Sequence, residues 1–102
     1  MFIRSKRNPI LKPNKKQSWQ SRKVYNAAAL YENNKYHLFY RAVGKDWLSR
    51  IGYAVSTDGE TYRRDRAPKF LPRGLLESRG VEDPRISKIN DKYYLTYTVY
   101  NR

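Results

Sequence analysis

Short runs of aromatic and β-branched residues, separated by polar turn residues, predict β-strands along most of this chain. The clearest runs are residues 36–40 (YHLFY) and 93–97 (YYLTY). Residues of these types favour strands over helices. Both runs are apolar or aromatic on both faces, which is typical of a strand with another layer packed on each side. We predict no helix, and the chain is therefore expected to be all-β.

Each run follows a pair of residues suited to a tight turn. Asn33-Asn34 and Asn90-Asp91 tolerate the positive φ that a two-residue hairpin turn requires. Pairing outward from these turns gives a register, with a one-residue shift if a bulge intervenes. It places Glu32 opposite Lys35, Asn26 opposite Arg41, and Asp83 opposite Thr98. A third hairpin is predicted around Asp58-Gly59, between residues 51–55 and 61–63.

The first two hairpins repeat at an interval of 57 residues. Under this shift five positions are identical: Asn33, Lys35, Tyr36, Leu38 and Tyr40 fall on Asn90, Lys92, Tyr93, Leu95 and Tyr97. In the same alignment Asn34 falls on Asp91 and Asn26 falls on Asp83. A repeat of this length built from strands is typical of propeller blades. A chance match of so short a segment is the alternative.

The repeat divides the chain into three segments. Residues 1–23 are expected to form a basic, extended lead-in, residues 24–80 a first propeller blade with its connector, and residues 81–102 the start of a second blade. This amounts to about one and a half blades, whereas a propeller closes radially. We therefore expect the chain to be the N-terminal part of a longer protein, or a truncated product.

The net charge of +13 is unevenly placed. Residues 1–23 hold eight Lys and Arg and no acid, residues 24–62 hold four of each sign, and residues 63–102 hold ten basic and five acidic residues. A basic arm is either a solvated tail or a contact for an anionic surface. No nucleic-acid motif accompanies it, so a nucleic-acid partner is not expected. With no long apolar run and no secretion signal, we expect no membrane contact and a cytoplasmic location.

The candidate chemistry lies in Val81-Glu82-Asp83-Pro84-Arg85, which places two carboxylates and a guanidinium at the start of a predicted strand. In the predicted register, Asn26, Arg41 and Asp83 converge at one rim of the strands. Glycoside hydrolysis usually needs two carboxylates, but phosphorolysis needs fewer because phosphate is the nucleophile. Asn26 cannot act as a base, whereas a protonated Asp83 can act as an acid. This pair suits a phosphorylase, and a hydrolase whose base lies elsewhere stays open.

Plainer interpretations exist for each of these residues. Glu82 and Asp83 are also suited to capping a turn, with Arg85 as a weak surface ion-pair partner. Asn26 is also suited to a turn or an edge, and Arg41 to stacking on a tyrosine. The absence of cysteine excludes disulfide and thiolate chemistry.

An ordered series of motifs points to a known family. The series is Asn8-Pro9-Ile10-Leu11, Trp19, residues 24–28 (VYNAA), Tyr40-Arg41-Ala42, residues 51–59 (IGYAVSTDG) and residues 80–86 (GVEDPRI). It resembles the N-terminal part of the β-1,4-mannoside phosphorylases, glycoside hydrolase family 130. The resemblance implies a partial five-bladed β-propeller with the sugar site at its axis. It also implies that β-mannosyl oligosaccharides are cleaved with inorganic phosphate, giving mannose 1-phosphate with inverted configuration.

Carried over by motif, the resemblance implies a role for each candidate residue. Asp83 is the general acid, which acts through a hydroxyl of the sugar, and Asn26 and Arg41 hold the mannosyl ring. Arg85, in the same motif, is a further candidate for substrate binding. No cofactor or metal is expected, and phosphate is a co-substrate.

Two departures from the family limit this expectation. Ala27 stands where the family often has Pro or Ser, so one sugar contact is expected to be missing. The family's phosphate-binding residues lie farther along its sequence than residue 102, so the chain alone is expected to be inactive. The alternatives are a non-catalytic β-rich remnant or binding module, and a β-mannoside hydrolase of the same family. The leaving-group sugar and a homo-oligomeric state stay open.

Overall fold

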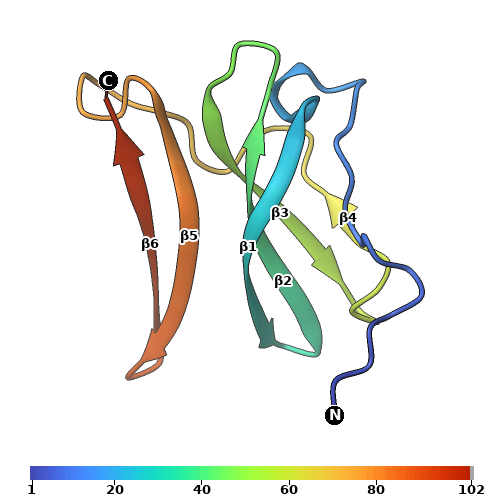
Figure 1. Ribbon diagram of the computed structural model, residues 1–102. Coiled ribbons are helices and arrows are strands. Elements are labelled where there is room, and N and C mark those ends of the chain that lie inside the picture. The colour runs from blue at the N-terminus through green and yellow to red at the C-terminus, as the bar shows by residue number, and fades with distance from the viewer. Residues whose placement is uncertain (102) are drawn as a thin grey trace.

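The computed structural model describes residues 1–101 of the 102-residue chain, and its regular structure is almost entirely β (Figure 1). The strands are β1 (Lys23–Glu32), β2 (Lys35–Val43), β3 (Ser49–Ser56), β4 (Arg63–Arg64), β5 (Gly80–Ile89) and β6 (Lys92–Tyr100). Within the described residues the helical structure is limited to one 3₁₀ turn, η1 (Ser18–Gln20). No helix there is long and apolar enough to span a membrane. The prediction of an all-β chain is confirmed.

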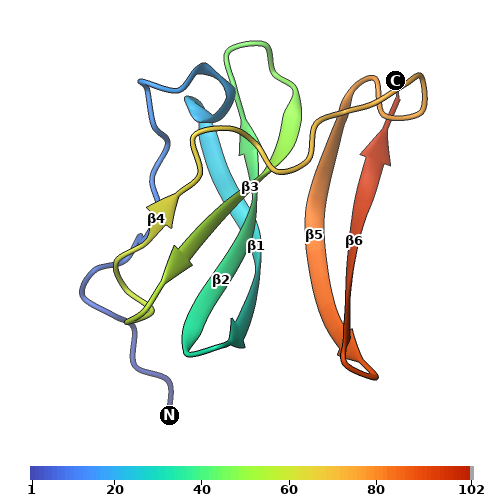
Figure 2. The same ribbon diagram turned by 180° about the vertical axis from the view of Figure 1, so that it is seen from behind.

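The strands form two units that stand side by side (Figures 1 and 2). β1, β2, β3 and β4 pair antiparallel in chain order and make a complete four-stranded blade. β5 and β6 form an antiparallel hairpin, joined to the first unit by one parallel bridge between Ser49 and Gly80. The chain is therefore part of a β-propeller, about one and a half blades of it. Its division into segments 1–23, 24–80 and 81–102 stays a prediction.

The predicted turns are confirmed. Glu32 pairs with Lys35 across the first turn and Ile89 with Lys92 across the second. The four turn residues all have positive φ, between 48° and 61°: Asn33, Asn34, Asn90 and Asp91. The third hairpin also forms, with Val55 of β3 opposite Arg63 of β4.

The register predicted without a bulge is wrong at both rim positions, and the one-residue shift expected for a bulge is found. Tyr25, and not Asn26, is the partner of Arg41, and Glu82, and not Asp83, is the partner of Thr98. In each hairpin the first strand holds one extra residue, a β-bulge, because Ala28 pairs with Phe39 and Arg85 with Thr96. The bulge accommodates a residue with left-handed backbone, and an Asn or Asp adopts this conformation more readily than most residues.

The core of the first blade surrounds Tyr40, which is almost fully buried. Its ring lies against Gly52, where a Cβ atom would be 2.4 Å from Tyr40 Cζ. Its hydroxyl donates a hydrogen bond of 2.9 Å to Oε1 of the buried Gln20, and burial raises the pKa of Tyr40 to about 12. Leu38, Ala42 and Ala54 are buried in the same cluster, and the residues packed against it are Ile10, Leu11, Trp19, Val24 and Tyr62. Ala28, Val43 and Ile51 of the blade are buried as well.

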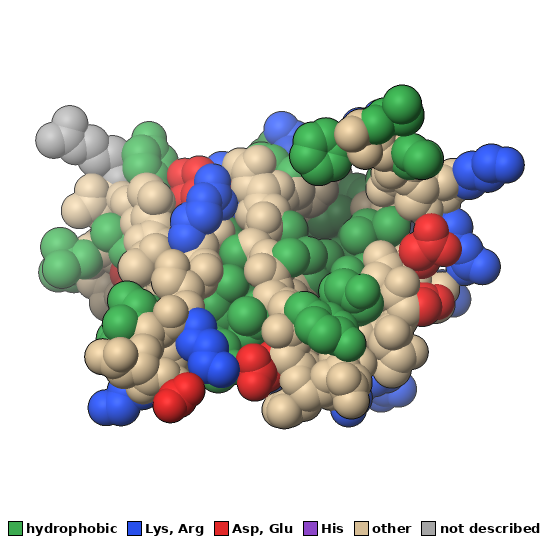
Figure 3. All heavy atoms as spheres, turned by 90° about the horizontal axis from the view of Figure 1, so that it is seen from below, with side chains coloured by type: hydrophobic (Ala, Val, Ile, Leu, Met, Phe, Trp, Pro, Cys, Tyr) green, Lys and Arg blue, Asp and Glu red, His purple; other side chains and the backbone are tan. Residues whose placement is uncertain are grey.

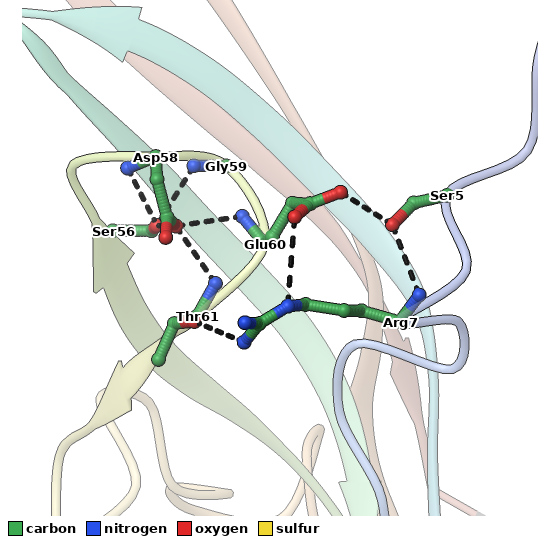
Figure 4. Close-up of polar contacts among 7 residues, drawn as sticks. All are labelled: Ser5, Arg7, Ser56, Asp58, Gly59, Glu60 and Thr61. Atoms are coloured by element: carbon green, nitrogen blue, oxygen red, sulfur yellow. Dashed lines mark hydrogen bonds and ion pairs between the residues drawn. The ribbon is translucent and has the colours of Figure 1, made fainter.

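The basic N-terminal segment packs on the blade and is not a free tail. Ser5 Oγ donates a hydrogen bond of 2.5 Å to Glu60, and the Arg7 guanidinium contacts both Glu60 and Thr61 (Figure 4). Trp19 Nε1 donates to the backbone carbonyl oxygen at position 66 over 2.8 Å. These contacts attach the segment from Ser5 onward to the β3–β4 turn and to the residues just after β4, so it belongs to the folded unit.

The β5–β6 unit is covered on one side, where it faces the first blade. Figure 3 shows the molecule from the end that carries the hairpin turns, with apolar side chains between the two units. At this end Lys88 Nζ lies 3.6 Å from Glu32 Oε2, which links β5 to β1. The aromatic residues of β6 are more than a third exposed: Tyr93, Tyr94, Tyr97 and Tyr100. The expected layer on the second side of β6 is therefore absent from residues 1–101.

Candidate functional site

Three of the four residues predicted for the site lie together at the rim opposite the hairpin turns. Asn26 Nδ2 donates a hydrogen bond to Asp83 Oδ1 over 2.9 Å. Arg41 Nη1 contacts the same oxygen at 3.4 Å. The predicted convergence of Asn26, Arg41 and Asp83 is found, although a bulge in each hairpin shifts the pairing by one residue from the regular register.

The bulges explain why the convergence survives the error in register. Asn26 has φ 47° and Asp83 has φ 53°, and each sits in the bulge of the first strand of its unit. A bulge redirects side chains and is common next to active sites. Because β1 and β5 are the corresponding strands of adjacent units, the two redirected side chains meet.

Arg41 is held from several sides. Its Nη2 atom lies 2.6 Å from Glu82 Oε2, and its Nε donates to Ser49 Oγ over 3.0 Å. Its guanidinium also lies 4.9 Å from the centre of the Tyr25 ring. The stacking that we considered as an alternative is thus present together with the carboxylate contacts. A guanidinium fixed in this way orients both carboxylates.

The two carboxylates of the cluster differ in their contacts. Glu82 forms the short ion pair with Arg41 and is mostly covered. Asp83 is about a third exposed, and its contacts all use Oδ1. Among residues 1–101 no hydrogen bond or ion pair reaches Asp83 Oδ2. This oxygen is therefore the one available to a hydroxyl group of a ligand, either as an acceptor or, when protonated, as an acid.

Arg85, the fourth predicted residue, does not join the cluster. Its side chain is exposed and donates to the backbone carbonyl oxygen of Pro84 over 2.8 Å. In a regular strand Asp83 and Arg85 would point to the same face, but the bulge between them breaks this alternation. The surface ion pair considered for Arg85 is not present within the described residues either.

Sequence reasoning gave no role in the site to Tyr25, Ser49 or Glu82. Glu82 stands next to Asp83 in the motif, so its position carried a signal that we did not use. Tyr25 likewise precedes Asn26 in the chain. Ser49 is separated from the motifs, and only its contact with Arg41 reveals it.

An open cavity of about 360 Å³ adjoins the cluster. It shares three residues with the cluster, namely Arg41, Ser49 and Glu82. Its other walls come from the loop between β2 and β3 and from the ends of the second unit, and they include Trp47, Arg79 and Tyr100. No sequence motif predicted this cavity.

Comparisons with known proteins agree on one family. A sequence profile of glycoside hydrolase family 130, described as β-1,4-mannooligosaccharide phosphorylase, matches residues 3–102. The chain is 44% identical over 110 residues to a β-1,2-mannobiose phosphorylase of Thermoanaerobacter sp. (strain X514), covering 95% of the chain and 36% of that protein. It is 43% identical over 98 residues to a 1,2-β-oligomannan phosphorylase of the same strain, covering 88% of the chain and 33% of that protein.

A solved structure gives the same result. It comes from work on the GH130 family of mannoside phosphorylases, which contains glycoside hydrolases that target β-1,2 mannosidic linkages in Candida mannan. It matches with a TM-score of 0.86 and 33% identity, covering 97% of this chain and 34% of that one. The chain thus spans about a third of the length of the relatives it matches.

Proposed function

Because the chain belongs to glycoside hydrolase family 130, we propose that it supplies the acid and the mannosyl-binding side chains of an inverting β-mannoside phosphorylase. The observation that carries the proposal is the contact of Asn26 and Arg41 with one oxygen of Asp83, at the rim where two propeller units meet. The relatives' names support β-mannosyl oligosaccharides and phosphate as the substrates.

In the proposed mechanism Asp83 is the proton donor. Its Oδ2 atom faces a hydroxyl of the mannosyl ring, which passes the proton to the glycosidic oxygen as the bond to the anomeric carbon breaks. Phosphate attacks that carbon from the opposite face, and mannose 1-phosphate forms with inversion. Asn26 and Arg41 hold both the carboxyl group and the ring in place. Both carboxylates contact Arg41, but Glu82 forms the shorter ion pair and is the more covered of the two, so Asp83 is the one proposed as the acid.

The chain alone is proposed to be inactive. In this view the phosphate-binding residues come from a part of the family's fold that lies outside the matched third of the relatives. The role of Arg85 in substrate binding is not part of the proposal, because its guanidinium donates to the Pro84 carbonyl oxygen and no contact with Asp83 is found within the described residues.

A chimera tests the proposal. The matched third of the Thermoanaerobacter β-1,2-mannobiose phosphorylase is replaced by this chain, and mannose 1-phosphate is measured with β-1,2-mannobiose and phosphate. We expect activity in the chimera and its loss in the Asp83→Asn variant. Asp91→Asn is the matched control, because Asp91 lies in the distant β5–β6 turn at φ 61°. Full turnover in Asp83→Asn would remove Asp83 from the proposed role.

A β-mannoside hydrolase is the second candidate function. It is favoured by the matching solved structure from work on family members that are hydrolases. The same chimera, assayed without phosphate, separates the two. Release of free mannose at an undiminished rate would support hydrolysis, whereas a strict requirement for phosphate would support phosphorolysis.

A further inference from the structure

We propose that a group of exposed cations beside the candidate site is a collecting surface for phosphate, which raises the concentration of this anionic co-substrate at the rim. The inference rests on the proposed function and gives a role to the basic N-terminal segment, which the contacts of the site do not use. The group, which we call the basic rim, consists of Lys12, Lys15, Lys16, Arg22, Lys23 and Lys45, all exposed.

The segment that carries most of these cations is fixed in place. A basic arm is either a solvated tail or a contact for an anionic surface. Here the Asn14 N–H donates to the Gln20 carbonyl oxygen over 3.0 Å, and the Asn14 carbonyl oxygen accepts from the Gln17 N–H over 3.1 Å. Asn14 Oδ1 also accepts from the Lys16 N–H over 3.0 Å. The backbone around Lys15 and Lys16 is thus a closed loop, which leaves the anionic contact as the interpretation.

The basic rim lies at the same end of the first unit as the candidate site. The Ser18 carbonyl oxygen accepts a hydrogen bond from the Lys45 N–H over 3.1 Å, and the Val43 carbonyl oxygen accepts one from the Arg22 N–H over 3.0 Å. These bonds join the N-terminal segment to the end of β2 and to the β2–β3 loop. Figures 1 and 2 show the segment and the loop together at the end opposite the hairpin turns.

The charges of the basic rim are not neutralised by acids. Residues 12–23 hold five cations and no acid. Within residues 1–101 no ion pair reaches any of the six side chains. The acids closest in sequence are engaged elsewhere, since Asp46 pairs with Arg50, and Asp65 with Lys69. Charges of one sign grouped in this way create a potential that raises the local concentration of anions.

This potential extends to the cavity beside the candidate site. The Arg22 guanidinium lies 4.2 Å and Lys23 Nζ 6.0 Å from the centre of the Trp47 ring. Trp47 is 61% exposed and lines the cavity together with Arg41. Exposed charges act over about 10 Å at an ionic strength of about 0.1 M. An anion that enters the cavity is therefore within reach of the cations above the indole.

The chemistry of the basic rim favours a small mobile anion. All but one of its cations are lysines, which attract by charge without the planar two-bond geometry that arginine imposes on a bound group. The proposed reaction consumes one small anion, phosphate, and releases another, mannose 1-phosphate, whereas the mannoside is neutral. A second copy of this chain is a poor partner, because its own net charge is +13.

Two variants with the same change in net charge and different locations test the inference. The rim variant is Lys15→Glu/Lys16→Glu/Lys45→Glu. The control variant uses three lysines that are also exposed, two of which follow the hairpin turns at the far end: Lys6→Glu/Lys35→Glu/Lys92→Glu. A difference between the two variants then reports where the charge lies and not how much of it is present.

The potential is measured on the chain itself by quenching of Trp47 fluorescence. Trp19→Phe leaves Trp47 as the single tryptophan, because the chain has two. Anionic iodide is compared with neutral acrylamide as the quencher at low ionic strength. We expect the ratio of iodide to acrylamide quenching constants to fall about twofold in the rim variant and to stay constant in the control variant. With Trp19 retained, a smaller difference of the same sign is expected, because Trp19 packs against the core.

The effect on the reaction is measured in the chimera. We expect kcat/KM for phosphate to fall about threefold in the rim variant at low ionic strength, and to match the control variant at about 0.5 M KCl. At saturating phosphate, kcat/KM for neutral β-1,2-mannobiose should be equal in the two variants. In the reverse direction, KM for mannose 1-phosphate should rise in the rim variant, whereas KM for mannose should not.

The outcomes distinguish this inference from the proposed function. Equal iodide quenching in the rim and control variants would overturn the collecting surface, whether or not the chimera is active. Equal kcat/KM for phosphate in the two variants would overturn it as well and would leave the phosphorylase proposal intact. A rim variant that loses activity equally toward phosphate and mannobiose would indicate damage to the site and contradict an effect of charge. Turnover that needs no phosphate would contradict both proposals.

Discussion

Asn26 and Asp83, 57 residues apart, are joined by a hydrogen bond of 2.9 Å and occupy equivalent bulges in successive propeller units. The equivalent position thus carries an amide in the first unit and a carboxyl in the second. The amide orients the carboxyl and cannot compete with it for the proton. This relationship ties the proposed acid to the interface between the two units, and the predictions below test what depends on it.

Asn26→Gly should remove the amide without disturbing the bulge, because Gly adopts φ 47° readily. In the chimera we expect activity to fall at least about tenfold, the loss that corresponds to one hydrogen bond to a charged group. Urea denaturation should show little change in stability. Asn26→Ala should lose the same activity and about 1 kcal/mol of stability, because a Cβ-bearing residue without a polar side chain is strained in this conformation. Equal activity of Asn26→Gly and wild type would contradict the role of Asn26.

Arg41→Lys should lower the stability of the fold and weaken binding of the mannoside. Lysine cannot reproduce the three contacts of the guanidinium with Asp83, Glu82 and Ser49. Glu82 would keep a mostly covered carboxylate with a weakened partner, and we expect stability to fall by about 1–3 kcal/mol. In the chimera KM for the mannoside should rise as well. Arg63→Lys, at an exposed residue of β4, is the control and should change neither quantity.

Gly52→Ala should destabilise the first blade. The added Cβ would lie 2.4 Å from Cζ of Tyr40, whose ring is enclosed by the core, so one of them must move. Overpacking of this kind costs about 1–3 kcal/mol, measurable as a lower urea midpoint. The double variant Gly52→Ala/Tyr40→Leu should show a smaller penalty from the alanine than the single variant does. A penalty of the same size in both backgrounds would argue against the contact.

Asp58 should contribute stability that is lost in acid. Its carboxylate accepts hydrogen bonds from the N–H groups of Thr61 and Glu60, which lower the pKa of Asp58 well below its usual range (Figure 4). A depressed pKa stabilises the folded state above the unfolded-state value of about 4, and this stabilisation fades as the pH falls toward the folded-state value.

The Asp58→Asn variant isolates this effect. Urea midpoints of wild type and variant are compared at pH 6 and at pH 2.5. The wild type should be more stable at pH 6, and the difference between the two proteins should shrink at the lower pH. A difference independent of pH would mean that the contribution of Asp58 does not depend on its charge.

The strands, the turns and the repeat are readable from the sequence because they depend on local chemistry. Aromatic and β-branched runs form strands, and Asn33-Asn34 and Asn90-Asp91 form turns because these residues tolerate positive φ. The meeting of Asn26 with Asp83 was predictable from the repeat, since equivalent positions of a repeat lie at the same rim.

Only the tertiary structure decided which side chains face the site. One bulge in each unit shifts the pairing by a residue, and a shift of one residue reverses the face on which side chains point. This is why Arg85, two residues from Asp83, does not join the cluster, and why Glu82 pairs with Arg41. The cavity beside them is assembled from Trp47, Arg79 and Tyr100, which lie in separate segments of the chain. No local pattern encodes their proximity, because it arises from how the second unit packs beside the first.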